Sequence, residues 1–253
     1  MLATQSFGAR TLKPALVLAH GFTQNARCWG TFGDLCTNDF DVLAVDAPGH
    51  GQSGYDTVDL NEAGRLILQA GGRAHYVGYS MGGRMLLHAA LNDQMGLIRS
   101  LILIGATPGI EDAAARSQRA SEDANRARHI LEVGTQTFIN EWLSMPMFAN
   151  ISVEESGLTK RYENSPDGMA ASLLACGTGS QDPLWESLPL LRIPVLVIAG
   201  SADTAYTDIG QRMVEKIGSN ARFVNIDGGH AVHLENPAVV AAVVSSWGAQ
   251  LSA

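Results

Sequence analysis

Short apolar runs alternate with helix-like patterns over the first hundred residues. The runs are rich in aliphatic and β-branched residues, which is typical of buried strands, and the segments between them repeat apolar residues with helical spacing. The predicted strands are 14–20, 41–46, 75–79 and 100–105, and the predicted helices are 60–71 and 81–93. This alternation predicts an α/β fold with a parallel sheet and right-handed crossovers.

The same pattern returns in the last third of the chain, after a long segment that has no strand pattern. The predicted strands there are 194–200 and 222–227, and the predicted helices are 207–216 and 237–250. The intervening segment is rich in Ala, Arg and Glu and predicts helices over 111–133 and 135–144. We therefore expect a core of residues 1–107 and 186–253, flanked by helices, with an inserted helical cap at 108–185 that packs on the sheet as a lid.

Composition narrows the possible partners. The chain has 253 residues, 46% of them hydrophobic, which suits one compact domain with an insertion. Its 17 Lys and Arg against 25 Asp and Glu give a net charge of -8, which argues against nucleic acid or an anionic membrane as a general partner. An anionic ligand would therefore need cations gathered locally. Nothing in the composition indicates the oligomeric state.

The cysteines and the N-terminal residues indicate where in the cell the protein is expected. Cys28, Cys36 and Cys176 lack the spacing of a zinc site or a disulfide framework. The first residues lack the apolar core of a signal peptide, and no apolar run approaches the roughly 20 residues that a bilayer requires. We expect a soluble protein of the cytoplasm without a membrane span.

The stretch Gly78-Tyr79-Ser80-Met81-Gly82 matches G-x-S-x-G where a predicted strand passes into a predicted helix. This context is the one in which the motif presents a nucleophilic serine at a sharp turn. A side chain at either flanking glycine would collide with nearby backbone in so tight a turn. Ser80 is therefore the candidate catalytic serine, the alternative being a glycine-rich turn with an idle serine.

A serine hydroxyl needs a partner that accepts its proton. Asp203 follows one predicted strand and His230 follows the next, so both are expected at the same sheet edge as Ser80. His233 competes with His230, and Asp227 competes with Asp203 as the acid. A metal site at His230 and His233 is not favoured, because no third ligand accompanies them.

Upstream, His20-Gly21-Phe22 follows the first long predicted strand. Such a turn can point the backbone N–H of Phe22 at the serine, where with the N–H of Met81 it would form a two-donor oxyanion hole. His50, in the loop after the second strand, is interpreted as part of the scaffold.

These motifs resemble the α/β-hydrolase superfamily along nearly the whole chain, apart from an N-terminus too short for the full leading hairpin. They are HGF, DAPGHGQS, GYSMGGR and GGHAVHLENP, in this order. The cap stretches ATPGIEDAAARSQR, EWLSMPMFAN and CGTGSQDPLWESL are similar to the MenH family, 2-succinyl-6-hydroxy-2,4-cyclohexadiene-1-carboxylate synthases.

Arginines suggest how an anionic substrate would bind. Arg84 lies four residues after Ser80, so its side chain can rise on the same helix face, although spacing alone fits a surface arginine equally well. The resemblance maps a cap arginine onto Arg119 and a second onto Arg161, where the local pattern departs by several positions. Candidates for further substrate contacts are His20, Tyr79 and Trp142, of which the two larger aromatic residues could instead pack in the core.

The resemblance implies elimination rather than hydrolysis. The expected substrate is a small polycarboxylate, 2-succinyl-5-enolpyruvyl-6-hydroxy-3-cyclohexene-1-carboxylate, from which Ser80 as base would remove a ring proton so that pyruvate leaves. No metal or organic cofactor is implied. Three alternatives remain open: a carboxylesterase or carbon–carbon bond hydrolase with Ser80 as nucleophile, a noncatalytic binding protein on the same fold, and a haloperoxidase-like enzyme.

Overall fold

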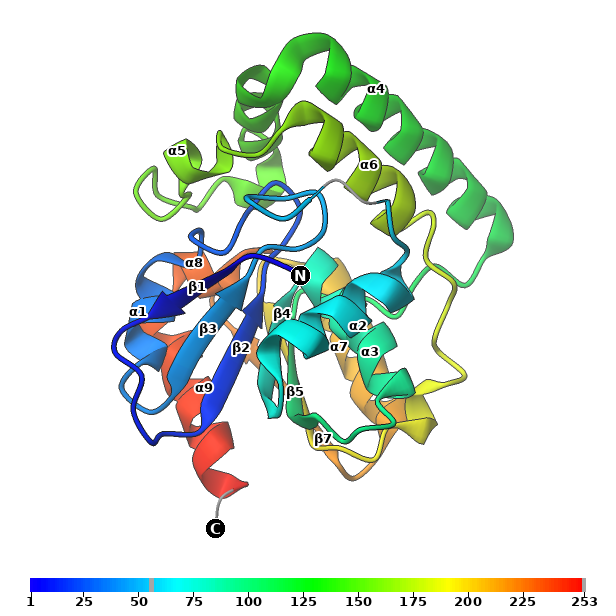
Figure 1. Ribbon diagram of the computed structural model, residues 1–253. Helices are drawn as coiled ribbons and strands as arrows, with labels where there is room; N and C mark the ends of the chain where they lie inside the picture. Colours follow the sequence, from blue (N-terminus) through cyan, green and yellow to red (C-terminus); the bar gives the residue numbers. More distant parts are fainter. Residues whose placement is uncertain (55–56, 252–253) are drawn as a thin grey trace.

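A computed structural model describes residues 1–54 and 57–251, and within them a seven-stranded sheet carries a helical cap (Figure 1). The strand order is β1-β3-β2-β4-β5-β6-β7, and only the edge strand β1 (Thr4–Phe7) is antiparallel to its neighbour. The other strands are β2 (Ala15–Ala19), β3 (Asp41–Val45), β4 (Ala74–Tyr79), β5 (Ile98–Ile104), β6 (Val195–Gly200) and β7 (Ala221–Ile226). The predicted parallel sheet is confirmed.

Each central strand is buried on both faces because its apolar residues alternate between two hydrophobic cores. In β2, Leu16 and Leu18 belong to one core, while Val17 belongs to the other. Helices α2 (Leu60–Gly71), α3 (Met81–Asn92) and α7 (Thr204–Ile217) contribute to the core that contains Val17. Helices α1 (Gly30–Cys36), α8 (Val232–Glu235) and α9 (Pro237–Gln250) contribute to the other. Continuous apolar strands are therefore covered on both sides, as a parallel sheet requires.

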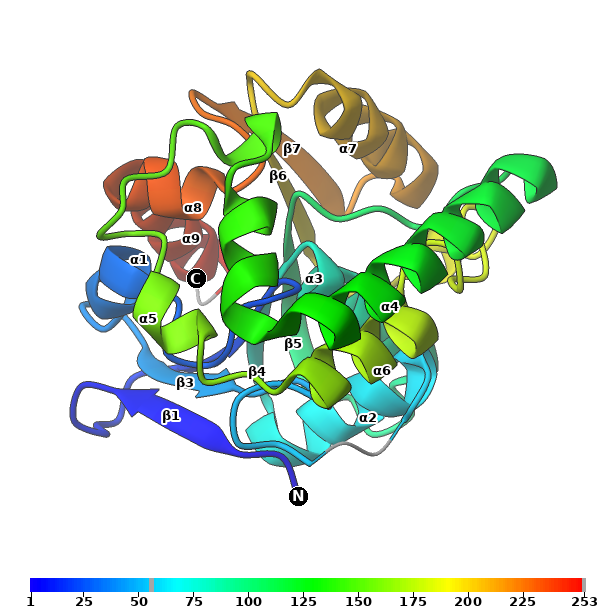
Figure 2. The same ribbon diagram turned by 90° about the horizontal axis from the view of Figure 1, so that it is seen from above.

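The cap lies over the edge of the sheet at which the parallel strands end (Figures 1 and 2). It consists of α4 (Ala113–Leu143), the 3₁₀ turn η1 (Pro146–Phe148), α5 (Leu158–Arg161) and α6 (Pro166–Cys176). Gly134 has φ 78° and ψ 170° inside α4, so this helix is two arms joined by a kink. The two helices predicted from the sequence, 111–133 and 135–144, correspond to these two arms. The cap has its own core, formed between α4 and α6.

Several short elements were not predicted. Strand β1 has only four residues, TQSF, without an apolar alternation, and it is held by pairing with β3. The patterns likewise did not indicate α1, α5, α6, α8 or the short 3₁₀ turns. Helix α6 is apolar on nearly all sides because it lies between α4 and the core, so it shows no amphipathic period.

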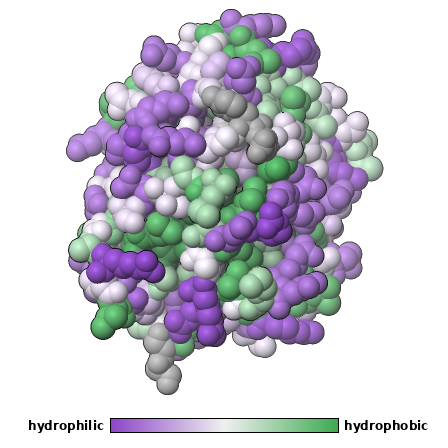
Figure 3. All heavy atoms as spheres, in the orientation of Figure 1, coloured by the Kyte–Doolittle hydropathy of each residue, from purple (hydrophilic) through white to green (hydrophobic). Residues whose placement is uncertain are grey.

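The surface is largely hydrophilic on the side seen in Figure 3, with smaller apolar areas near its middle. In the part of the chain that the structure describes, none of the helices combines the length and apolar content of a membrane crossing. Acidic residues outnumber basic residues in the sequence, so arginines gathered at one place stand out against the overall charge.

Candidate active site

Ser80 lies at the sharp turn between β4 and α3, in a strained backbone conformation. Its φ is 49° and its ψ is -107°, a region that non-glycine residues rarely adopt. Such strain persists only when the surrounding structure enforces it, and it concentrates at functional sites. The turn holds the hydroxyl above the sheet edge, beneath the cap.

The flanking glycines permit this turn by close backbone packing. A Cβ on Gly78 would lie 2.5 Å from the Cα of Gly83, and a Cβ on Gly82 would lie 2.1 Å from the carbonyl oxygen of Ala19. Neither contact can be relieved by a side-chain rotation because both partners are backbone atoms. The steric reason that the sequence suggested for G-x-S-x-G therefore matches the geometry.

His230 connects Ser80 to Asp203. The Ser80 hydroxyl donates to His230 Nε2 with an Oγ–N distance of 3.2 Å, and His230 Nδ1–H donates to Asp203 Oδ2 at 2.7 Å. A carboxylate only accepts hydrogen bonds, so Asp203 fixes the tautomer that leaves Nε2 free to take a proton. His230 is buried and Asp203 is partly buried. This arrangement can make the serine either a base or a nucleophile.

The two rival residues lie elsewhere. The ring of His233 packs between Trp29 and Tyr79, and neither of its nitrogens has a hydrogen-bond partner among the described residues. Burial lowers its pKa to about 3, so it remains neutral in the folded chain. The carboxylate of Asp227 instead accepts from the hydroxyl of Ser201 at 3.3 Å.

Two backbone N–H groups remain available beside Ser80. Those of Phe22 and Met81 donate to no acceptor within residues 1–54 and 57–251, and both residues line the cavity. Met81 is the first residue of α3, where an N–H has no partner within the helix. An oxygen that acquires negative charge near Ser80 could accept hydrogen bonds from both groups.

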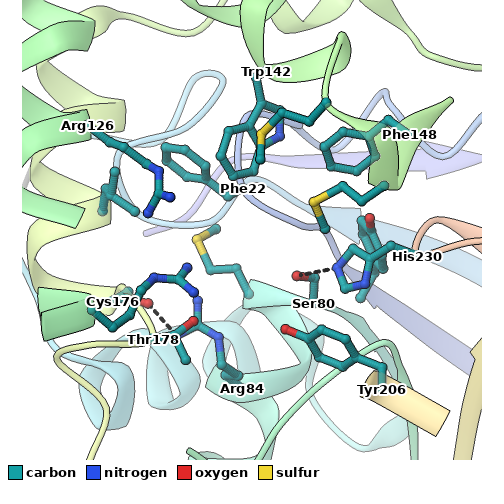
Figure 4. A pocket seen from close by; sticks show the side chains of 16 residues that line it. Phe22, Ser80, Arg84, Arg126, Trp142, Phe148, Cys176, Thr178, Tyr206 and His230 are labelled. Carbon is teal, nitrogen blue, oxygen red and sulfur yellow. Dashed lines mark hydrogen bonds between the residues drawn. The ribbon is translucent and has the colours of Figure 1, made fainter. Parts of the chain in front are cut away.

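A cavity of about 210 Å³ lies between the sheet edge and the cap (Figure 4). The core contributes Ser80, His230 and Tyr206, while the cap contributes Trp142 and Phe148. Aromatic and methionine side chains from the cap cover the reacting groups, and arginines lie toward the other side of the cavity (Figure 4). The cavity thus joins an apolar region to a cationic region.

Arg84 is the buried cation nearest to Ser80 in the chain. It is 6% exposed, and its Nη1 donates to the carbonyl oxygen of Cys176 at 2.5 Å. No carboxylate pairs with it in the described part of the chain. Burial lowers the pKa of Arg84, because little water reaches its charge. A buried cation of this kind is stabilised when a ligand supplies the missing anion.

The cap adds two more arginines to the cavity lining. Arg119, which the resemblance indicated, and Arg126, which it did not, both lie on α4. Both guanidinium groups contact the buried carboxylate of Asp123. A signal for Arg126 was present in the sequence, because residues seven apart on a helix share one face.

The structure places His20 and Arg161 differently from the substrate contacts that the sequence suggested. His20 Nδ1–H donates to the carbonyl oxygen of Gly21 and Nε2 accepts from the N–H of Ala47, so both nitrogens bind backbone. Arg161 is 2% exposed and donates to the carbonyl oxygen of Ser156 and the hydroxyl of Thr23. Neither residue lines the cavity. Both brace the loops around it instead.

Tyr79 and Trp142 do line the cavity. Burial raises the pKa of Tyr79, so its phenol stays protonated. Trp142 packs against Phe22 with ring centroids 5.4 Å apart, and its Nε1–H is buried without an acceptor among the described residues.

Tyr206 is a cavity residue that the sequence did not indicate. It lies in the first turn of α7 close after Asp203, its ring centroid is 4.6 Å from that of His230, and it lines the cavity. No motif marks this tyrosine in the sequence. Its position follows only from the way α7 begins at the sheet edge.

The residues do not suggest a metal centre. Within the described ranges, no group of three or more His, Cys, Asp or Glu side chains is arranged to hold a metal ion. The pairing of His230 with Ser80 and Asp203 occupies both of its nitrogens.

Comparisons with known proteins agree on one family. Residues 16–243 match the alpha/beta hydrolase family. A 2-succinyl-6-hydroxy-2,4-cyclohexadiene-1-carboxylate synthase of Salmonella newport is 32% identical over 95% of this chain and 96% of its own length, and one of an Enterobacter species is 31% identical over 92% and 90%. The solved structure of MenH from S. aureus covers 100% of this chain and 99% of its own, with 29% identity and a TM-score of 0.88. The predicted α/β-hydrolase fold is confirmed.

Proposed function

Because the chain belongs to the MenH family of the α/β-hydrolase superfamily, we propose that it eliminates pyruvate from 2-succinyl-5-enolpyruvyl-6-hydroxy-3-cyclohexene-1-carboxylate. The product is 2-succinyl-6-hydroxy-2,4-cyclohexadiene-1-carboxylate, an intermediate of menaquinone biosynthesis. The observation that carries this proposal is Arg84, a buried guanidinium on the Ser80 helix without a carboxylate partner among the described residues. The proposed substrate has three carboxylates that could pair with this guanidinium, whereas a neutral ester has none.

Ser80 acts as the base in this proposal. His230 takes the hydroxyl proton as Ser80 removes a proton from a ring carbon, and Asp203 stabilises the imidazolium that results. The electrons of the broken C–H bond form a new ring double bond, and the C–O bond to the enolpyruvyl group breaks. The leaving group takes up a proton on carbon and becomes pyruvate. No water is consumed, so the serine never has to carry an acyl group.

The remaining groups of the cavity stabilise charge and hold the substrate. The N–H groups of Phe22 and Met81 stabilise the negative charge that develops on a substrate oxygen as the ring proton leaves. Arg84 and Arg119 bind carboxylates, and charge-assisted hydrogen bonds of this kind are stronger than neutral ones. Tyr79 and Trp142 contact the cyclohexene ring of the substrate.

The cap acts as a lid over the reacting groups. Exclusion of water protects the ring anion from side reactions, and it strengthens every electrostatic interaction in the cavity. We assign the enzyme to the cytoplasm, in keeping with Cys28, Cys36 and Cys176, which are free and buried thiols.

Hydrolysis of a carboxylic ester is the second candidate, because the hydrogen bonds of His230 with Ser80 and Asp203 suit a nucleophilic serine as well. The deciding experiment incubates the enzyme with the enolpyruvyl substrate and measures pyruvate, with p-nitrophenyl acetate as the comparison. Pyruvate release with a kcat/KM at least about 10⁴ M⁻¹s⁻¹ supports elimination. Rapid ester turnover without pyruvate release would establish the hydrolase instead.

A further inference from the structure

Arg126 is a cation of the cavity to which neither the sequence motifs nor the proposed reaction gives a role. It lies on α4, about two helical turns after Arg119, and the two side chains therefore project from one face of the helix. Both line the cavity, with 36% of the Arg119 side chain and 35% of the Arg126 side chain exposed. In Figure 4 the guanidinium of Arg126 points from the cap toward the interior of the cavity.

A buried carboxylate holds this pair in place. Asp123 lies between the two arginines on α4, and its side chain is only 2% exposed. Its Oδ1 accepts from Nε of Arg119 at 2.8 Å and from Nη1 of Arg126 at 3.2 Å. Its Oδ2 accepts from the N–H of Gly179 at 3.2 Å, which ties α4 to the segment after α6. Each arginine therefore uses one N–H group here, and a guanidinium has five.

Among the described residues, the cavity has more arginines than buried carboxylates that pair with them. Arg84, Arg119 and Arg126 line it, and Asp123 is the one buried carboxylate that pairs with any of them among the described residues. Glu122 approaches Arg126 only at 3.8 Å, and 44% of its side chain is exposed, so water screens this contact. At least one positive charge on α4 and the charge of Arg84 are thus available to a ligand.

We propose that Arg126 is a substrate-binding residue, which together with Arg119 forms a second carboxylate subsite beneath the cap, apart from the one at Arg84. Two such subsites select a ligand with at least two carboxylates over a monocarboxylate. The identity of the natural ligand rests on the proposed function, whereas the subsite itself is defined by the cations of α4.

The test compares Arg126→Gln with Arg128→Gln. Arg128 lies on the same helix and carries the same charge, but it is exposed, bonds to Asn125 and does not line the cavity. Calorimetry measures the dissociation constants of propane-1,2,3-tricarboxylate and of butyrate for each protein. Arg126→Gln should weaken the tricarboxylate about 10-fold or more and change butyrate less than twofold, while Arg128→Gln should match the parent protein for both.

Equal binding of the tricarboxylate by Arg126→Gln and the parent protein would overturn the proposal, as would an equal loss for both ligands. If Arg126→Gln does not fold, as judged by circular dichroism, Arg126→Lys retains the charge and should bind the tricarboxylate within about threefold of the parent. With the enolpyruvyl substrate, Arg126→Gln should raise KM about 10-fold and change kcat less than threefold. Absence of pyruvate release by the parent would refute the proposed function alone, because the calorimetric comparison does not depend on turnover.

Discussion

At the scale of single residues, the conformation of Ser80 and the hydrogen bonds of His230 are linked. The positive φ of Ser80 directs its hydroxyl to Nε2, and Asp203 holds the other side of the imidazole. His230 is the shared partner of Ser80 and Asp203, and because the three residues act as one unit, the effects of their substitutions on turnover are not additive.

We therefore predict that Ser80→Ala and His230→Ala each lower kcat for pyruvate formation by at least about 10³-fold. Thermal unfolding should change little, because both side chains lie at a cavity rather than in the centre of a core. His233→Phe serves as the control and should retain most of the activity. If His233→Phe were inactive and His230→Ala remained active, His233 rather than His230 would be the histidine that accepts the serine proton.

Arg84 distinguishes a charged substrate from a neutral one. Losing a desolvated charged contact costs about 2–5 kcal/mol, so Arg84→Gln should lower kcat/KM for pyruvate formation about 30-fold or more. Hydrolysis of p-nitrophenyl acetate should change less than threefold. Arg65→Gln, at an exposed position of α2 that pairs with Glu62, should leave both rates unchanged. Equal losses of both activities in Arg84→Gln would mean that this arginine supports the structure of the site and does not bind a substrate carboxylate.

His233 makes folding sensitive to acid. Its folded pKa of about 3 lies below the ordinary value of 6.5, so the unfolded chain binds more protons between these two pH values. Its contribution to stability is complete above pH 6.5 and is lost as the pH falls toward 3. Between pH 7 and pH 5, His233→Phe should lose about 2 kcal/mol less unfolding free energy than the parent. Urea titrations at both pH values measure this difference, and equal losses would contradict it.

The sequence indicated some residues of the cavity and not others for identifiable reasons. Ser80 lies in a motif whose backbone geometry demands glycines at fixed positions, so its surroundings could be anticipated. Arg126 and Tyr206 lie in helices without a motif, and only the packing of α4 and α7 brings them to the cavity. His20 follows a strand at the right place, but its ring turns inward to bind backbone.

At the scale of elements, the strands were predictable because continuous apolar runs suit a sheet that is covered on both faces. The cap was harder to predict from the sequence, because α6 is apolar on nearly all sides and therefore shows no helical alternation of apolar and polar residues. Gly134 indicated where the cap helices divide. It lies between the two helices predicted from the sequence, and in the structure it is the residue at the kink of α4. One arm of this helix carries Arg126 and the other carries Trp142, so the kink sets their relative position.

We expect Gly134→Ala to lower the free energy of unfolding by about 1–3 kcal/mol. A φ of 78° with a ψ of 170° is available essentially to glycine alone, although open space surrounds a Cβ there. KM for the enolpyruvyl substrate should rise because the two arms shift. Gly54→Ala is the matched control, since it also has open space but no positive φ. Urea denaturation of both variants provides the measurement, and equal stabilities would refute a strained kink.

At the scale of the whole molecule, an acidic protein concentrates three arginines in one cavity. The sheet supplies Ser80, Asp203 and His230 at the ends of its strands, and the cap supplies Arg119 and Arg126 from above. This division lets one fold perform an elimination with groups that elsewhere suit hydrolysis. The role of Ser80 as a base, rather than the fold, therefore separates elimination from hydrolysis.

Intact-protein mass spectrometry of samples quenched during a single turnover tests this role of Ser80 most directly. If Ser80 is a base, the mass of the protein stays unchanged at every time point while the enolpyruvyl substrate yields its ring product and pyruvate. Detection of a substrate adduct on Ser80 that forms and then decays into product at the rate of turnover would contradict the account and establish nucleophilic catalysis.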